Sequence, residues 1–307
     1  MKWIKKGILF NPSSQIKWAV NSALQPTPLV INENLVRMYC GMRDAEGISR
    51  VGFVEIARQD DKLIVTKVSD EPVLSIGKPG TFDDNGVVPS AIVQRGSEIF
   101  MYYAGYQIVK NVRFLVLGGL AISNDGGLTF KRYKNTPVLE RTDNEFLFRV
   151  VHTVLFDKEK WCAWYGGGSH FQVEGEKSFP VYDIRYMESD DGIKFPDQGS
   201  VVLQNETKEY RVGRPFVIKS REQYLMFFGA STPDIPYRLA YATSNDGKNW
   251  ERKKIDIPYA SGDFDSDMSA YPSIVELQGR TYLIYNGNEY GKYGFGYAEL
   301  EGDLWNW

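Results

Sequence analysis

The sequence predicts an all-β protein, a five-bladed propeller with four antiparallel strands per blade, because two landmarks recur five times along the chain. One landmark is the glycine that ends the second strand of each repeat: Gly41, Gly105, Gly167, Gly229 and Gly287. The other is the residue that opens the first strand: Pro28, Pro89, His152, Pro215 and Pro272. The glycines are 64, 62, 62 and 58 residues apart, and the strand-opening residues are 61, 63, 63 and 57 apart. Such a fixed period in a sequence of strands is typical of a propeller.

The second repeat shows the predicted unit most clearly. Residues 83–86 are polar loop residues, and residues 87–93 are β-branched and apolar, as in a buried strand. A turn is expected at residues 95–97, where glycine can adopt a positive φ angle. Residues 99–103 then form an aromatic-rich second strand. Each repeat therefore begins with a loop and a hairpin.

Two further strands are expected after each hairpin. Third strands are predicted at residues 50–56, 117–123, 182–189, 238–244 and 293–300. Fourth strands are predicted at residues 63–68, 130–138, 199–203 and 250–257. Three of these strand pairs are joined by similar Asp-Gly turns, at residues 123–126, 189–192 and 244–247. Aspartate and glycine favour tight turns, so we interpret these three segments as structural rather than catalytic.

The last repeat lacks its own fourth strand, because only EGDLWNW follows Leu300. An unassigned strand at residues 3–10 contains KKGILFNP, which is similar to KKIDIPYA at the end of the fourth repeat. We therefore predict that the N-terminal strand completes the last blade and closes the ring, which removes exposed sheet edges. On this interpretation residues 1–307 form a single domain.

Composition excludes several partner classes. The formal net charge of −3 gives no overall basic field for nucleic acid. No stretch approaches the roughly 18 apolar residues of a membrane span, and the N-terminal apolar run is too short for a signal peptide. Cys40 and Cys162 fall in non-adjacent blades, as expected for two buried thiols in a reduced cytoplasm. No Cys–His cluster has metal-ligand spacing, so neither a metal nor another cofactor is expected, although an oxygen-only calcium site stays open.

Strand direction places the inter-blade loops and the loops between second and third strands on one face. The residues of interest there are Arg43 and Asp44, then Asp83, Asp84, Tyr106 and Arg113, then Arg149, His152 and His170, then Glu209, Arg211 and Arg214, and finally Asp267 and Tyr271. Carboxylates, arginines and tyrosines around one end of an axis suit a polar, hydroxyl-rich or anionic ligand. The alternative is that loops are polar in any protein, and that Asp83 only caps a turn between blades.

Some of these residues are stronger candidates than others. Asp84 and Asp267 each lie five residues before a strand-opening proline, at matching places in two repeats. Arg149 and Arg214 lie where hydrophobic strands begin, and a long cationic side chain at such a place needs a partner or a ligand. Two interpretations of His152 stay open: a hydrogen-bonded residue of the core, which we favour slightly, and a catalytic residue.

The blade pattern PSAIV…IFMYYAG…LAISNDGGLTF resembles the repeat of the five-bladed propeller superfamily of glycoside hydrolases, which contains families 43, 32, 68, 117 and 130. YCGMRDAEGISRVGF is similar to the Arg-Asp-containing blade of the family-130 mannoside phosphorylases. WIKKGILFNP, GTFDDNGVVPS, the GRP of blade four and MSAYPSIV…YNGNEYGKYGFGYAEL resemble an uncharacterised branch found beside bacterial surface-polysaccharide genes. The resemblance implies a carbohydrate-active enzyme acting on a surface-glycan sugar or an anionic precursor of it.

The chain departs from the resemblance at the catalytic positions. Families 43 and 32 use an acid entering blade one, an Asp in blade two and a Glu in blade three. Residues 19–25, which enter blade one, contain no acid, and the only acid near the start of blade three is Glu145. Only the blade-two position, Asp83 or Asp84, carries over.

Three function classes remain open, and the first is a glycosidase or a phosphorylase. A glycosidase usually needs two carboxyl groups, about 5–5.5 Å apart for retention and about 6.5–9.5 Å apart for inversion, and the candidates are Asp84, Glu209 and Asp267. The arginines could bind phosphate, as in a phosphorylase, or a phosphorylated or carboxylated sugar. The other two classes are a transferase that uses an activated sugar and a non-catalytic glycan-binding propeller.

Overall fold

A computed structural model of the chain describes residues 1–12, 16–175, 177–220 and 223–305. It is nearly all β, as predicted. Its strands are β1(Lys2–Phe10), β2(Asn21–Asn32), β3(Leu35–Arg43), β4(Ser49–Gln59), β5(Lys62–Val68), β6(Val87–Arg95), β7(Glu98–Gln107), β8(Leu115–Ser123), β9(Lys131–Arg132), β10(Phe148–Asp157), β11(Lys160–Glu174), β12(Lys177–Ser189), β13(Ser200–Leu203), β14(Arg211–Lys219), β15(Tyr224–Ser231), β16(Arg238–Ser244), β17(Glu251–Lys253), β18(Ala270–Leu277), β19(Arg280–Asn286) and β20(Phe295–Glu301). A single turn of helix, α1(Asn288–Gly291), precedes β20.

The strand pairings follow the sequence repeat. Consecutive strands pair antiparallel in β2–β5, β6–β9, β10–β13, β14–β17 and β18–β20, which we call units one to five. Strands such as β3 and β7 are buried at nearly every position, so side chains on both of their faces pack against neighbouring units. Tyr39 of unit one, for example, packs edge-to-face on Phe130 of unit two, with ring centroids 5.5 Å apart. The apolar core therefore lies between successive sheets.

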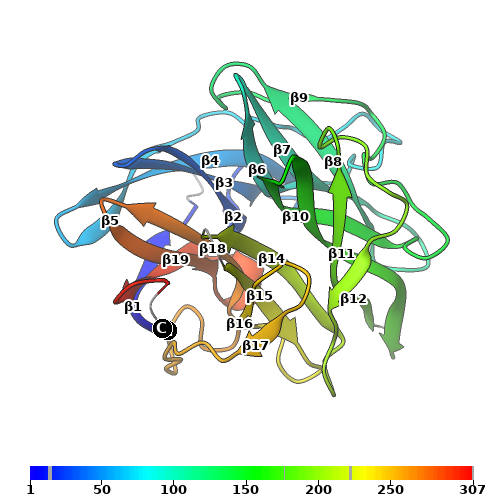
Figure 1. Cartoon of the computed structure of the whole chain (residues 1–307). Helices are drawn as coiled ribbons and strands as arrows, with labels where there is room; N and C mark the ends of the chain where they lie inside the picture. Colours follow the sequence, from blue (N-terminus) through cyan, green and yellow to red (C-terminus); the bar gives the residue numbers. More distant parts are fainter. Residues whose placement is uncertain (13–15, 176, 221–222, 306–307) are drawn as a thin grey trace.

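The N-terminal strand completes the sheet of the last unit. β1 pairs antiparallel with β20, from Lys2 opposite Glu301 to Phe10 opposite Phe295. Figure 1 shows β1, in blue, beside the red strands at the other end of the chain. The prediction that residues 3–10 pair with the last strand is confirmed.

The first strand of each unit contacts the first strand of the next. Contacts join β2 to β6, β6 to β10, β10 to β14 and β14 to β18, and β18 also contacts β2. Every first strand carries a bulge where its pairing register shifts, and bulges re-aim side chains. The residues inside these bulges include Gln25, Ser90, His152, Arg214 and Tyr271. One bulge residue from each unit is thus presented at an equivalent place.

The Asp-Gly turns are structural, as the sequence indicated. In the first of them, Asp125 accepts hydrogen bonds from the N–H groups of Leu128 and Thr129, at 2.9 and 3.0 Å. The carbonyl of Gly127 in the same turn accepts a 2.7 Å hydrogen bond from the hydroxyl of Tyr39, in the preceding unit. The turn therefore fastens one unit to the next.

Two further features bear on the sequence predictions. Cys40 and Cys162 are both buried and unpaired, as expected. Within the described residues, no helix has the length and apolar character needed to cross a bilayer.

Candidate functional site

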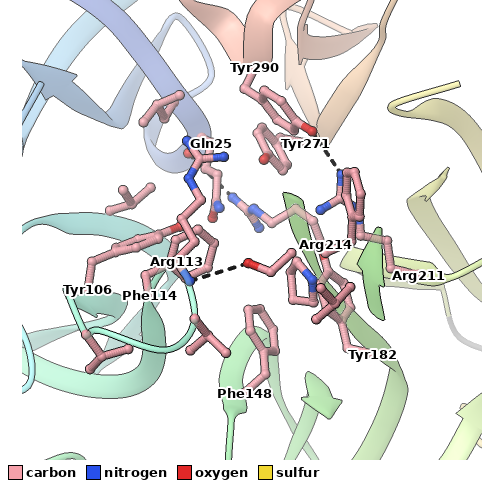
Figure 2. A pocket seen from close by; sticks show the side chains of 18 of the residues that line it. Gln25, Tyr106, Arg113, Phe114, Phe148, Tyr182, Arg211, Arg214, Tyr271 and Tyr290 are labelled. Carbon is pink, nitrogen blue, oxygen red and sulfur yellow. Dashed lines mark hydrogen bonds between the residues drawn. The ribbon is translucent and has the colours of Figure 1, made fainter. Parts of the chain in front are cut away.

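A cavity of about 820 Å³ lies where the first strands begin, and all five units contribute to its wall. Its lining includes Leu24, Gln25 and Arg43 of unit one, Val88 and Tyr106 of unit two with the loop at residues 109–114, Phe148, His152, Val173, Gly175, Ser178, Phe179, Pro180 and Tyr182 of unit three, Arg211 and Arg214 of unit four, and Tyr271 and Tyr290 of unit five. Figure 2 shows the labelled side chains converging on one space. Its volume falls within the usual range for small-ligand sites.

The charge of the lining has one sign. Arg43, Lys110, Arg113, Arg211 and Arg214 line the cavity, and among the described residues no carboxylate does. None of these five cations forms an ion pair with a described residue, whereas arginines elsewhere do. Unpaired cations in a partly desolvated space create a strongly positive local field.

Arg214 holds the first strands together at the base of the cavity. Its side chain is 3% exposed, and its guanidinium donates to the carbonyl oxygen of Ser90 at 2.8 Å and to Oγ1 of Thr27 at 2.7 Å. Longer bonds reach the carbonyl oxygens of His152 and Gln25, at 3.4 and 3.5 Å. Figure 2 shows Arg214 extending toward Gln25. Burial without a carboxylate partner lowers the pKa of Arg214 to about 9.

Arg211 is surrounded by aromatic rings. The guanidinium carbon lies 4.8 Å from the ring centroid of Tyr210 and 4.6 Å from that of Tyr237, and its Nη2 donates a 2.9 Å hydrogen bond to the hydroxyl of Tyr290. Cation–π contacts and neutral phenols stabilise the guanidinium without cancelling its charge. The positive charge of Arg211 therefore stays available to the cavity, and Figure 2 shows its hydrogen bond to Tyr290 as a dashed line.

Several buried polar atoms at the cavity have no hydrogen-bond partner within the described part of the chain: Oε1 of Gln25, Nδ1 of His152, and Nε of Arg211 and Arg214. Such atoms are rare in native proteins, and here they gather at the cavity. Burial, and next the charge of Arg214, lower the pKa of His152 well below its usual value, so its imidazole is neutral at pH 7.

Backbone strain gathers at the same place. Gln25, Arg214, Tyr271 and Tyr290 all line the cavity and all have positive φ angles, between 53° and 58°. Residues with side chains seldom adopt this conformation, and such strain concentrates at ligand-binding sites.

Aromatic side chains also line the cavity. The rings of Phe148 and Tyr182 stack with centroids 4.4 Å apart, and Tyr106 meets Phe114 edge-to-face at 5.5 Å. Flat apolar faces beside hydrogen-bonding groups suit a ring-shaped, partly polar ligand.

The structure places seven of the residues singled out in the sequence in the lining of this cavity: Arg43, Tyr106, Arg113, His152, Arg211, Arg214 and Tyr271. Seven others are not among the lining residues: Asp44, Asp83, Asp84, Arg149, His170, Glu209 and Asp267. The second set contains all of the predicted carboxylates, including the three proposed as catalytic. Arg214 therefore lines the cavity without Asp84 and Asp267, and the catalytic role of these carboxylates stays a prediction.

Ion pairs that stabilise the sheets engage two of these carboxylates. Asp83, which is fully buried, accepts from the hydroxyl of Tyr103 at 3.0 Å and from Nε of Arg132, on β9, at 2.7 Å. Glu209 is paired in the same way with Arg252 of β17, at 3.0 Å. In units two and four, the carboxylate before the first strand is thus paired with a cation on the fourth strand.

Unit three contains a related buried cluster. Glu145 is fully buried and accepts from Nε of Arg149 at 2.6 Å, from the hydroxyl of Tyr165 at 2.6 Å and from Arg185 at 2.7 Å. Arg149 is therefore paired inside the unit, with no free charge for the cavity.

The remaining predicted residues have local surroundings. Asp44 pairs with Arg50 at 2.5 Å and accepts a 2.9 Å hydrogen bond from the N–H of Ile48. Asp84 accepts from the N–H of Gly80 at 2.8 Å. Asp267 and His170 are exposed.

Some lining residues were not proposed from the sequence, notably Gln25, Phe114, Phe148, Tyr182 and Tyr290. Gln25 carries a usable signal, because it precedes a proline just as Arg214 and Tyr271 do. Phe148 and Tyr182 read as ordinary strand residues, and no local pattern marks them.

No family model matches the chain. The chain is 32% identical over 307 residues to the "Uncharacterized protein Rv1502" of Mycobacterium tuberculosis (strain ATCC 25618 / H37Rv), an alignment that covers 98% of this chain and 100% of the relative. Among solved structures it is similar to a glycoside hydrolase, with TM-score 0.75 and 17% identity over 98% of this chain and 92% of that one. It is also similar to a thermostable family-43 glycoside hydrolase, with TM-score 0.61 and 16% identity over 93% and 91% of the two chains.

A third similar structure is the GH32 β-fructofuranosidase BmSUC1 of Bombyx mori, with TM-score 0.61 and 15% identity over 95% of this chain and 62% of that one. At these identities the solved structures show the fold alone. The identity to the mycobacterial protein, by contrast, extends over the whole relative. The chain therefore belongs to the family of Rv1502, and it has the fold of the propeller glycoside hydrolases.

Proposed function

We propose that this protein is a carbohydrate-active protein whose cavity binds a sugar carrying negative charge. The observation that supports this most is the lining itself, which contains five cations and no described carboxylate. The aromatic wall, formed in part by Phe148 and Tyr182, would pack on the sugar ring. The likeness to glycoside hydrolases supports a sugar as the ligand class.

We also propose that residues 1–307 form one closed five-bladed propeller. The cyclic contacts of the first strands and the pairing of β1 with β20 support this arrangement. Closure would fix the five first strands around one axis, which is what brings Gln25, His152, Arg214 and Tyr271 together.

The reaction class follows from the same lining. A phosphorylase-like or transferase-like reaction on an anionic sugar is favoured over hydrolysis by two carboxylates, because no described carboxylate lines the cavity. Hydrolysis through Asp84, Glu209 and Asp267, on a surface-glycan sugar, is the second candidate. It is supported only by the glycoside hydrolase fold.

Calorimetric titration with matched pairs of neutral and anionic sugars tests the proposed function. Each anionic sugar should bind more tightly than its neutral counterpart, and Arg43→Gln should weaken the anionic one by about tenfold, the effect of one charge-assisted hydrogen bond. Arg141→Gln is the matched control, because Arg141 is exposed and does not line the cavity. Equal affinity of both sugars in every pair would contradict the proposal.

The two reaction classes separate by mutation. If the predicted carboxylates are catalytic, Asp84→Asn, Asp267→Asn and Glu209→Gln should each lower turnover by about 10²-fold or more. If the cavity acts without them, these variants should keep wild-type affinity and turnover while Arg43→Gln does not.

A further inference from the structure

We propose that the negative charge recognised by the cavity is a phosphoryl group, so that the ligand is a sugar phosphate or a sugar diphosphate rather than a sugar carboxylate. This inference rests on the proposed function and names the anion that it leaves open. It follows from how many donors converge, how they are placed and how much charge they carry.

Three guanidinium groups from three units line the cavity together with Tyr106. Burial raises the pKa of Tyr106 to about 12, and the charges of Arg43, Arg113 and Arg211 oppose that rise. These arginines come from the end of β3, from the loop before β8 and from β14, so only the folded chain brings them together. The folded chain thus gathers three cations and a phenol in the lining of one cavity.

The number of donors exceeds what a carboxylate can accept. Each guanidinium offers five N–H donors, whereas a carboxylate has about four lone-pair sites. A phosphoryl group carries up to about two negative charges and three strong acceptor oxygens at neutral pH. No described residue forms a hydrogen bond or an ion pair with the guanidinium of Arg43 or of Arg113, so both are free to bind such a group.

The deeper donors point to the same chemistry. Arg211 and Arg214 are 7% and 3% exposed, and neither forms an ion pair with a described residue. A buried cation without a counter-ion is strongly unfavourable, and a dianion offsets more of this charge than a monoanion does. Lys110 adds a further positive charge at the rim.

The size of the cavity allows the rest of the ligand. A volume of about 820 Å³ exceeds what one phosphoryl group needs. The stacked rings of Phe148 and Tyr182 line the cavity, as do Phe179 and Pro180. A sugar ring, or a second phosphoryl group with its substituent, would occupy this space.

Calorimetric titration of the full chain with five probes tests the proposal: inorganic phosphate, pyrophosphate, uridine diphosphate, glucose 1-phosphate and glucuronate. At least one phosphoryl probe should bind about tenfold or more tightly than glucuronate. If phosphate and glucose 1-phosphate bind most tightly, the ligand carries a monophosphate. If pyrophosphate and uridine diphosphate bind most tightly, it carries a diphosphate.

Two variants place the binding in the cavity. Arg211→Met and Arg43→Gln should each weaken the best phosphoryl probe by about tenfold or more, while Arg141→Gln leaves it unchanged. Arg43 is partly exposed, so its variant keeps the test valid if Arg211→Met fails to fold.

Glucuronate binding more tightly than every phosphoryl probe would overturn this inference and leave the proposed function intact. If none of the four phosphoryl probes binds, the inference also fails. If in addition no anionic sugar binds better than its neutral counterpart, the proposed function fails with it.

Discussion

His152 shows how one buried side chain can set a pH dependence. Burial lowers its folded-state pKa well below about 6.5, the value expected in the unfolded chain. Below pH 6.5 the imidazole of the unfolded chain therefore binds a proton, whereas that of the folded chain stays neutral. The free energy of unfolding must then decrease as the pH decreases. Above pH 6.5 the imidazole is neutral in both states and contributes no slope.

We predict that His152→Gln flattens this dependence between about pH 6.5 and pH 5. The free energy of unfolding should depend on pH more steeply in the wild type than in His152→Gln. The difference in slope should be up to about 1.4 kcal/mol per pH unit, the free energy that corresponds to one pKa unit. Urea denaturation at several pH values measures it. His170→Gln serves as the control, because His170 is exposed. Identical slopes in wild type and His152→Gln would contradict the assignment.

Arg214 ties together strands that are distant in sequence. Its bonds to Ser90 and Thr27 satisfy acceptors on β6 and β2, and a lysine cannot span both with its single ammonium group. Arg214→Lys should therefore lower the free energy of unfolding by about 1–3 kcal/mol, the penalty for one buried acceptor left unpaired. Arg113→Lys, at an exposed position, should change it far less. Equal effects of the two variants would refute the structural role.

Among elements, the N-terminal strand is fastened by more than its backbone pairing. Nζ of Lys5, on β1, lies 2.7 Å from the carboxylate of Asp265, which is fully buried. It also lies 2.8 Å from the carboxylate of Asp263, which is partly exposed. Asp265 also accepts a 2.8 Å hydrogen bond from the hydroxyl of Tyr285. Asp83 in unit two has the same pattern with a tyrosine and a fourth-strand cation. The interaction therefore repeats in units two and five, each of which buries an aspartate that precedes its first strand.

Lys5→Met should therefore destabilise the protein markedly. Removing one partner of a buried ion pair leaves the other charge uncompensated, a loss of about 3 kcal/mol or more. Chemical denaturation at pH 7 provides the measurement. Lys2→Met is the matched control, because Lys2 pairs with Glu301 at an exposed site and should have a smaller effect. The account of β1 fails if the two variants are equally stable.

These elements also show why the sequence predicted more of the fold than of the site. The repeat period fixes which residues form strands, and the missing last strand implies the pairing of β1 with β20. The period places Asp83 and Glu209 before first strands, but it does not reveal that Arg132 and Arg252 bind them away from the cavity. Partners on another strand are long-range contacts that local patterns do not encode.

At the scale of the whole molecule, the proposed closure of the ring depends on the pairing of β1 with β20. Deleting residues 1–10 would expose the edge of β20 and remove Trp3, which is 2% exposed and packs on Phe227. We predict a clear fall in Tm, because removing a buried tryptophan alone typically costs about 3–5 kcal/mol. Differential scanning calorimetry of the truncated chain provides the test. An unchanged Tm would contradict closure.

The central claim is that a sugar with a phosphoryl group binds among the unpaired cations of the cavity. A crystal structure of the protein soaked with glucose 1-phosphate and, separately, with uridine diphosphate tests it most directly. We predict phosphoryl density within hydrogen-bonding distance of Arg211 and of Arg43 or Arg113, with the sugar or nucleoside against the wall formed by Phe148 and Tyr182. Ordered ligand density beside Asp84 and Asp267 instead, with the cationic cavity left empty, would contradict the account.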